Sequence, residues 1–238
     1  MADSQDVLLS VVVLYSGAVG AVIGGFWLAV TWMRSFGKKV GYSLTPLGFS
    51  RPRGGILAGV GTGMAVGVGA ILFGMVVKPL SALVLERLGY STKSTIQQPF
   101  MQGLVGWVQE SPGVAVPVIV LVVVILGPAV EELVFRGAVF NGLYRLGVLI
   151  SSIGTERSNG PPSKTIFVAS ALSSSILFAL LHLEPVLLPV IFILAITLCA
   201  LFQRSGSLLP SFVAHATFNS FAIILIILRG LNILHIPI

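Results

Sequence analysis

Long apolar runs, separated by short polar or basic segments, dominate the hydropathy pattern of this 238-residue chain. A transmembrane helix needs about 20 apolar residues in a row. The apolar runs and one more mixed stretch predict about seven spans, within a range of six to eight: 7–32, 56–77, 114–130, 131–150, 165–181, 186–202 and 208–228. The runs are too continuous for barrel strands, which alternate over about 10 residues. We therefore expect an all-α, polytopic membrane protein.

Three segments need separate interpretation. Acidic residues rather than basic ones precede the run at 7–32, which we expect to be an uncleaved first span rather than a signal peptide. Residues 78–112 mix charges with short apolar stretches, a pattern typical of interfacial or re-entrant helices. Residues 151–164 contain Gly and Pro clusters and predict a loop. We expect 1–238 to form a single membrane domain.

Composition supports the membrane class. The chain is 55% hydrophobic and only 9% charged, whereas soluble domains carry about 25% charged residues. The formal net charge is +6, but the basic residues cluster between apolar runs. This is the positive-inside pattern of membrane proteins rather than a nucleic-acid-binding surface. The chain is therefore predicted to lie in a lipid bilayer, the cytoplasmic (plasma) membrane if it is prokaryotic, and to bind no nucleic acid.

The basic residues also predict an orientation. The segment 34–53 holds several of them and no acidic residue, so we expect it to be cytosolic and the N-terminus to lie outside. Its basic residues are Arg34, Lys38, Lys39, Arg51 and Arg53. Counting spans from there puts Glu131 and His182 near the cytoplasmic ends of their helices. His215 falls nearer the opposite side, which a tilted or broken span would reconcile.

Small residues recur at four-residue spacing in the second predicted span: Gly55, Gly59, Gly63 and Gly67. Such a stripe lets two helix backbones approach closely in lipid. A phosphate-binding loop is the alternative, but neither a preceding strand nor a following Lys-Ser/Thr pair supports it. The single cysteine, Cys199, lies inside an apolar run, which predicts a packing thiol and excludes an internal disulfide.

Two adjacent carboxylates, Glu131 and Glu132, directly follow an apolar run. Ionisable residues in such a position indicate a functional site. Glu132 and Arg136 are four residues apart with the acid first, which favours a side-chain pair on a helix. Glu131 would point about 100° away and would be free to act on a water molecule. The alternative is a charged cluster at a helix end near the membrane interface.

Two further pairs lie downstream, each four residues apart and so on one helix face: Phe178 with His182, and His215 with Asn219. His182 could instead be interfacial, and Phe178 is expected to pack. His215 and Asn219 are costly in a membrane interior, which predicts a shared polar cavity. The remaining histidine, His235, is expected to have no role.

Together these side chains supply the groups of a hydrolytic site. A carboxylate and a histidine could hold and activate water. A histidine and an asparagine could donate hydrogen bonds to a developing oxyanion. The sequence contains neither a serine nucleophile elbow nor a His-Glu-x-x-His motif.

The order and spacing of these residues resemble the CAAX prenyl endopeptidase and bacteriocin-processing (Abi) family of intramembrane proteases. The family motifs Glu-Glu-x-x-x-Arg, Phe-x-x-x-His and His-x-x-x-Asn stand here at 131–136, 178–182 and 215–219. The resemblance covers 128–220, which we expect to be the catalytic core. Residues 1–112 carry no comparable signature and are expected to be variable N-terminal spans and an interfacial segment.

The resemblance implies a helical membrane peptidase whose cavity opens toward the cytosol. Its substrate would be a membrane-associated protein or peptide, for example one with a prenylated C-terminus. By the same resemblance, Glu131 is the general base, His182 helps to hold the water, and His215 and Asn219 form the oxyanion hole. The supporting residues are Glu132, Arg136 and Phe178.

Three alternatives remain open. Glu131, His182 and His215 could form a His₂Glu zinc set, although we favour a mechanism without a cofactor because Asn219 suits an oxyanion hole. The same fold could serve as a weakly catalytic or non-catalytic membrane immunity or partner protein. A proton-coupled transporter could use the acid and the two histidines as a relay, but the chain lacks an obvious inverted repeat. The intramembrane endopeptidase is the preferred hypothesis.

Overall fold

The structure is a computed structural model that describes residues 47–93, 97–153 and 164–234. These residues form helices and no strands. Five helical segments in this part of the chain are long and apolar enough to cross a membrane: Ile56–Arg87, Pro112–Ser151, Lys164–Leu181, Leu188–Ser205 and Leu208–Gly230. The predicted all-α membrane class is confirmed. The predicted number of about seven spans is not confirmed, and the expected first span, 7–32, lies outside the described residues.

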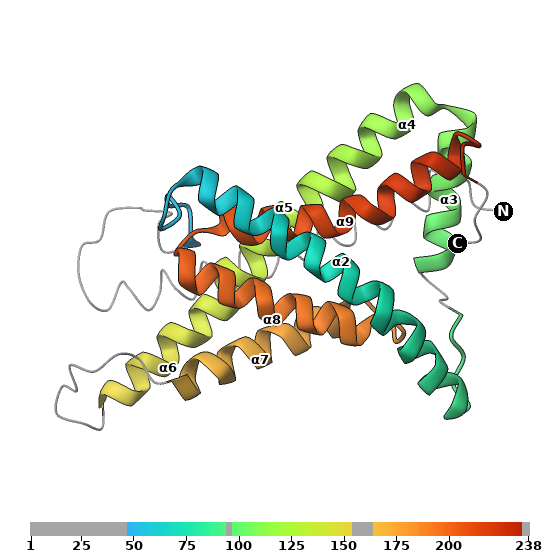
Figure 1. Ribbon diagram of the computed structural model, residues 1–238. Helices are drawn as coiled ribbons and strands as arrows, with labels where there is room; N and C mark the ends of the chain where they lie inside the picture. The colour runs from blue at the N-terminus through green and yellow to red at the C-terminus, as the bar shows by residue number, and fades with distance from the viewer. Residues whose placement is uncertain (1–46, 94–96, 154–163, 235–238) are drawn as a thin grey trace.

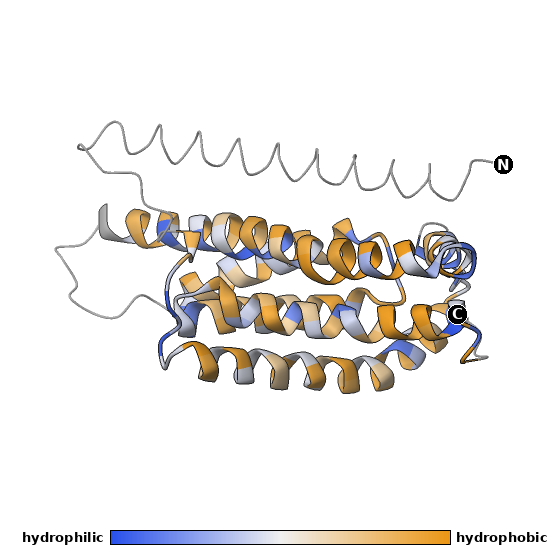
Figure 2. Cartoon of the chain, turned by 90° about the horizontal axis from the view of Figure 1, so that it is seen from above, coloured by the Kyte–Doolittle hydropathy of each residue, from blue (hydrophilic) through white to orange (hydrophobic). Residues whose placement is uncertain are grey.

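The chain runs through α2 (Ile56–Arg87), α3 (Gln97–Glu110), a long composite helix, α7 (Lys164–Leu181), α8 (Leu188–Ser205) and α9 (Leu208–Gly230). The composite helix consists of α4 (Pro112–Ile119), η2 (Val120–Leu126), α5 (Gly127–Glu132), η3 (Leu133–Phe140) and α6 (Asn141–Ile153). It crosses the bundle obliquely, with α4 and α6 at opposite corners (Figure 1). Apolar residues cover much of the helix surfaces, as a membrane environment requires (Figure 2).

The predicted boundary between spans 114–130 and 131–150 is wrong, because both lie within the composite helix. Residues 112–153 are continuous, with π-helical turns at η2 and η3. Pro128 lacks a backbone N–H and its ring crowds the preceding turn, and a π turn before such a residue can absorb the misfit. Glu131 therefore lies within a helix rather than at its end. Counting 112–153 as a single crossing reverses the sense predicted for each later helix, and the topology stays a prediction.

The mixed segment 78–112 divides between two helices. The helix predicted at 56–77 begins at Ile56 but continues through Pro79 to Arg87, ten residues beyond the predicted end. After an intervening turn, α3 packs against α4 and α9. Part of the segment is therefore helical, and its expected interfacial position stays a prediction.

Three of the four glycines in the predicted stripe lie on the face of α2 that packs against α9, whereas Gly55 precedes the helix and is exposed. Gly59, Gly63 and Gly67 are buried, and a Cβ on Gly67 would lie 2.6 Å from the backbone oxygen of Ala214. The predicted close approach of two helices is thus confirmed. The contact lies at Ala214, the residue directly before His215. Cys199 is fully buried, as expected of a packing thiol.

Substituting Gly67 by alanine is expected to destabilise the protein by about 1–3 kcal/mol, the usual cost of overpacking. The added methyl group would meet the backbone of α9, which cannot rotate away as a side chain can. Thermal unfolding in detergent measures the effect. Gly69→Ala on the same helix is the matched control, because a Cβ there meets nothing within 4 Å. Equal melting temperatures for the two variants would contradict the close packing.

Candidate active site

The composite helix carries a buried ion pair. Glu132 ends α5 and Arg136 lies one turn later in η3, with Nη1 2.8 Å from Oε1. The exposed fractions of the two residues are 0% and 1%. The pair predicted from the four-residue spacing is confirmed, and its burial within a helix contradicts the alternative of a charged cluster at the interface.

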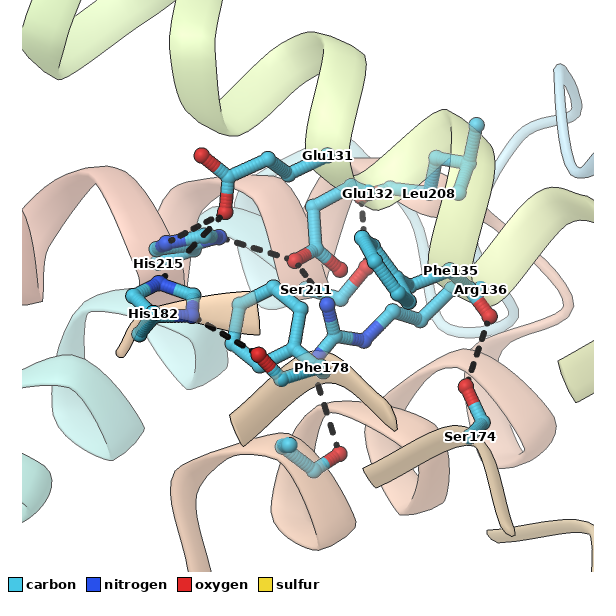
Figure 3. Close-up of polar contacts among 11 residues, drawn as sticks. Glu131, Glu132, Phe135, Arg136, Ser174, Phe178, His182, Leu208, Ser211 and His215 are labelled. Carbon is cyan, nitrogen blue, oxygen red and sulfur yellow. Dashed lines mark hydrogen bonds and ion pairs between the residues drawn. The ribbon is translucent and has the colours of Figure 1, made fainter. Parts of the chain in front are cut away.

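His215 connects the two carboxylates (Figure 3). Its Nδ1 lies 2.9 Å from Oε1 of Glu132, and its Nε2 lies 3.7 Å from Oε2 of Glu131. An ionised carboxylate can only accept hydrogen bonds, so Nδ1 donates to Glu132. This bond fixes the ring, and the side chain is only 3% exposed. α9 thus brings the third motif onto the first.

His182 approaches the same carboxylate from α7. It directly follows Leu181, the last residue of that helix, and its Nδ1 lies 2.8 Å from the backbone oxygen of Phe178. Because a carbonyl can only accept, Nδ1 donates here too. Its Nε2 lies 4.0 Å from Oε2 of Glu131. The His182 side chain is 29% exposed, so the cluster is accessible from its side.

Three polar atoms therefore converge at one buried point: Oε2 of Glu131 and Nε2 of each histidine. With Nδ1 donating to Phe178, neutral His182 presents the lone pair of Nε2 toward Glu131, whereas Nε2 of His215 accepts when the ring is neutral and donates when it is doubly protonated. Oε2 of Glu131 is buried and makes no hydrogen bond within the described part of the protein. Buried polar atoms normally have a partner. A water molecule offers two O–H donors, one for Oε2 of Glu131 and one for Nε2 of His182, and would lie against a carboxylate base.

A zinc ion fits the same three side chains less well. Ligand atoms about 2.0–2.2 Å from a tetrahedral zinc ion lie about 3.3–3.6 Å from one another. The distances from Oε2 of Glu131 to the two Nε2 atoms are 3.7 and 4.0 Å. Among the described residues, no group of three or more His, Cys, Asp or Glu residues has an arrangement that could hold a metal ion.

Phe178 packs at the centre of the cluster. Its ring centroid lies 4.5 Å from the guanidinium carbon of Arg136, 4.6 Å from the ring of His182 and 5.7 Å from the ring of His215. The Phe135 ring meets it edge-on at 4.9 Å. Phe178 therefore orients the charged and imidazole groups by contact and accepts the hydrogen bond of His182. This agrees with the packing expected of it.

Asn219 lies one turn beyond His215 on α9. Its Nδ2 donates a 3.3 Å hydrogen bond to the backbone oxygen of Val123 in η2. This bond goes to the π-helical backbone and not to the Glu131 cluster. A primary amide has two N–H donors, so one bond to Val123 leaves a second donor. An oxyanion role for Asn219 stays a prediction.

Two serines at the site were not predicted from the sequence. Ser211 is fully buried, donates a 3.0 Å hydrogen bond to the Leu208 backbone oxygen and lies beside Glu132 (Figure 3). Ser174 donates to the backbone oxygen of Phe135 and so joins α7 to η3. The spacing could have indicated Ser211, because it stands four residues before His215 in a polar row that ends at Asn219. Ser174 gave no such signal.

Comparisons with known proteins agree with the three motifs. Residues 113–221 match the family model described as "Type II CAAX prenyl endopeptidase Rce1-like". Over 111 residues the chain is 28% identical to a Bacillus subtilis (strain 168) protein named "Putative membrane peptidase YdiL". That match covers 47% of this chain and 38% of the relative's length. No solved structure matches the chain. The matched region contains all three motifs, so the family resemblance predicted from them is confirmed there.

Proposed function

We propose that the chain is an intramembrane endopeptidase, because residues 113–221 match the model of the Rce1-like CAAX prenyl endopeptidase family. It would hydrolyse a peptide bond in a membrane-associated protein or peptide, for example near a prenylated C-terminus. The observation that carries the proposal is the convergence of His182 and His215 on Oε2 of Glu131. This geometry suits a water molecule held against a base in a water-poor site.

In this mechanism Glu131 accepts a proton from the bound water while the water oxygen attacks the carbonyl carbon of the substrate. The lone pair of His182 Nε2 accepts a hydrogen bond from the second O–H of the water. This bond orients the water oxygen toward the carbonyl carbon. The protonated Glu131 then transfers its proton to the amide nitrogen as the C–N bond breaks. The proton taken from water therefore leaves with the amine product, and Glu131 returns to its ionised form.

The negative charge that develops on the carbonyl oxygen needs donors. For His215 to donate from Nε2 while Nδ1 donates to Glu132, the ring must be doubly protonated and positively charged. The Glu132 carboxylate, 2.9 Å from Nδ1, supplies the counter-charge. Nη1 of Arg136 contacts the same carboxylate oxygen, Oε1, at 2.8 Å and adds a second positive charge beside it. The second N–H of Asn219 would complete the oxyanion hole.

Substituting Asn219 by aspartate is expected to lower kcat by about 10²–10³-fold, the usual loss when one oxyanion donor is removed. Aspartate keeps the size of the side chain but, when ionised, has no donor. KM should change little, because the interaction forms only in the transition state. Steady-state kinetics with a cleavable peptide provide the measurement. An unchanged kcat together with a lower melting temperature would instead limit Asn219 to its bond with Val123.

Incubation of the purified wild-type protein with defined peptides tests the activity and the role of metal together. We would compare a prenylated C-terminal peptide, the same peptide without the prenyl group and a panel of membrane peptides, each with and without a chelator. Cleavage that the chelator does not affect is the expected result. Cleavage lost with the chelator and restored by zinc would contradict the metal-free mechanism. Binding of these peptides without cleavage of any would favour a non-catalytic partner protein.

A further inference from the structure

Glu184 is a second buried carboxylate close to the proposed active site. It stands two residues after His182, in the turn between α7 and α8, so the Cα atoms of these two residues lie within about 7 Å of one another. Glu131 and Glu184 are each 7% exposed, and Oε2 of each is buried and makes no hydrogen bond within the described part of the protein. Glu132, in contrast, is paired with Arg136. Glu184 therefore shares the environment of the proposed base but lies outside its pair of histidines.

The backbone of the turn directs Glu184 into the bundle. α7 ends at Leu181, and Leu183 has a φ of 51°, a left-handed conformation that is unfavourable for a leucine. Leu183 is 64% exposed and Pro185 is exposed as well. Glu184 and Val186, which alternate with them, are buried. The strained turn thus buries a carboxylate and leaves a leucine outside, and strained backbone of this kind clusters at functional sites.

The turn lies at the accessible side of the cluster. The His182 side chain is 29% exposed, and its Nε2 faces Glu131 (Figure 3). At the other end of the turn, Leu187 packs against the same hydrophobic cluster as Val130, the residue before Glu131. The turn is thus fixed at both ends to the residues that surround the proposed base. A peptide that enters beside His182 would pass Glu184.

The carboxylates give this side of the site an excess of negative charge. The charge of Glu132 is balanced by Arg136 at 2.8 Å, whereas none of the ion pairs among the described residues includes Glu184. Burying an ionised carboxylate is unfavourable unless a cation pairs with it. An ammonium or guanidinium group of a substrate would supply that cation and donate charge-assisted hydrogen bonds. A neutral or acidic side chain would not.

We propose that Glu184 binds the positively charged side chain of a lysine or arginine in the substrate. The substrate class is then a membrane-associated peptide or protein with a basic residue within about four positions of the cleaved bond. Four residues of an extended peptide span about 14 Å, enough to reach from Glu131 past His182 to the turn. The inference rests on the proposed peptidase function, and it gives Glu184 a role in specificity and not in the chemical step.

The first test compares matched peptides on the full chain in detergent. In a peptide that the wild type cleaves, lysine or norleucine is placed in turn at each of the four positions on either side of the cleaved bond. Norleucine keeps the straight carbon chain without the charge. At one or two positions kcat/KM should be about 30-fold higher with lysine, the lower end of the loss when one partner of a buried charge pair is removed. Equal kcat/KM with lysine and norleucine at every position would overturn the proposal.

Variants then assign the preference to Glu184. Glu184→Gln should raise KM for the lysine peptide by about 30-fold and leave kcat unchanged, because the ion pair forms equally in the ground and transition states. Glu184→Asp, which keeps the charge, should retain part of the preference. Glu110→Gln, which removes an exposed carboxylate at the end of α3, is the matched control and should retain all of it. A folded Glu184→Gln that keeps the preference contradicts the proposal, as does an equal loss of kcat for both peptides, which a purely structural role predicts.

Two further measurements decide the remaining cases. If Glu184→Gln does not fold, carbodiimide coupling of the lysine peptide to the wild type should place the crosslink on Glu184, and crosslinks at other carboxylates alone would overturn the proposal. If the wild type cleaves no peptide, displacement of a bound fluorescent peptide measures affinity directly. Lysine peptides should then bind the wild type about 30-fold more tightly than norleucine peptides, so that the cation site stands although the peptidase proposal fails. Equal affinities would overturn the cation site itself.

Discussion

Replacing Glu131 by glutamine is expected to reduce peptide cleavage by about 10²–10⁴-fold, the contribution of a positioned general base. Glutamine has nearly the same shape but cannot take a proton from water. The side chain is 10% exposed and faces the two Nε2 atoms, so bulk water offers no equally positioned substitute. Single-turnover cleavage of a peptide that wild type hydrolyses provides the measurement, with folding checked by the melting temperature.

The control and a binding assay make this result specific. Glu110→Gln removes an exposed carboxylate at the end of α3 and should leave the rate unchanged. Peptide binding should persist in Glu131→Gln, because the amide still fits the site. Loss of cleavage with retained binding supports the enzyme over the partner protein. A rate within about threefold of wild type would remove Glu131 from the role of base.

Substituting Arg136 by methionine is expected to destabilise the protein by about 3–5 kcal/mol, the cost of leaving one buried charge without its partner. Glu132 is fully buried, and its nearest cation is Nη1 of Arg136 at 2.8 Å. The substitution also removes the guanidinium group from the face of the Phe178 ring. Chemical denaturation in detergent measures the loss. Arg87→Met, at an exposed position, is the control and should have little effect.

A double-mutant cycle separates the charge from the packing. Arg136→Met combined with Glu132→Gln removes both charges and should recover part of the lost stability, since no ionised group is then left unpaired. Activity should not recover, because His215 loses the carboxylate that holds its Nδ1. Equal destabilisation in Arg136→Met and in the double variant would show that the guanidinium group acts mainly by packing.

The spacing of residues in the sequence was sufficient to predict those contacts that form between near neighbours on one helix. Glu132 and Arg136 pair because residues four apart share a helix face, and this holds wherever the helix lies. The glycine stripe of α2 likewise predicts a close helix contact from periodicity alone. The periodicity did not predict that the partner helix is α9, because many helices could pack closely against a row of glycines.

The sequence wrongly predicted a boundary between two spans near Pro128 and the two glutamates, and the reason is physical. Proline and adjacent charges usually end a span, but both are tolerated inside a protein that pairs the charges and absorbs the proline in a π turn. Glu132 meets Arg136 on its own helix and His215 on α9. One of the two partners of Glu132, His215, thus lies 83 residues away in the sequence. A local sequence pattern cannot predict such a contact.

The membrane class, the helical fold, the Glu132–Arg136 pair and the order of the three motifs could all be predicted from the sequence, since they follow from hydropathy, helical period and spacing. Two features could not: that 112–153 is one helix, and that Nε2 of both histidines faces Glu131. Each of these depends on how distant helices pack and on which lone pair a neighbouring oxygen leaves exposed. Those properties are absent from any short stretch of the chain.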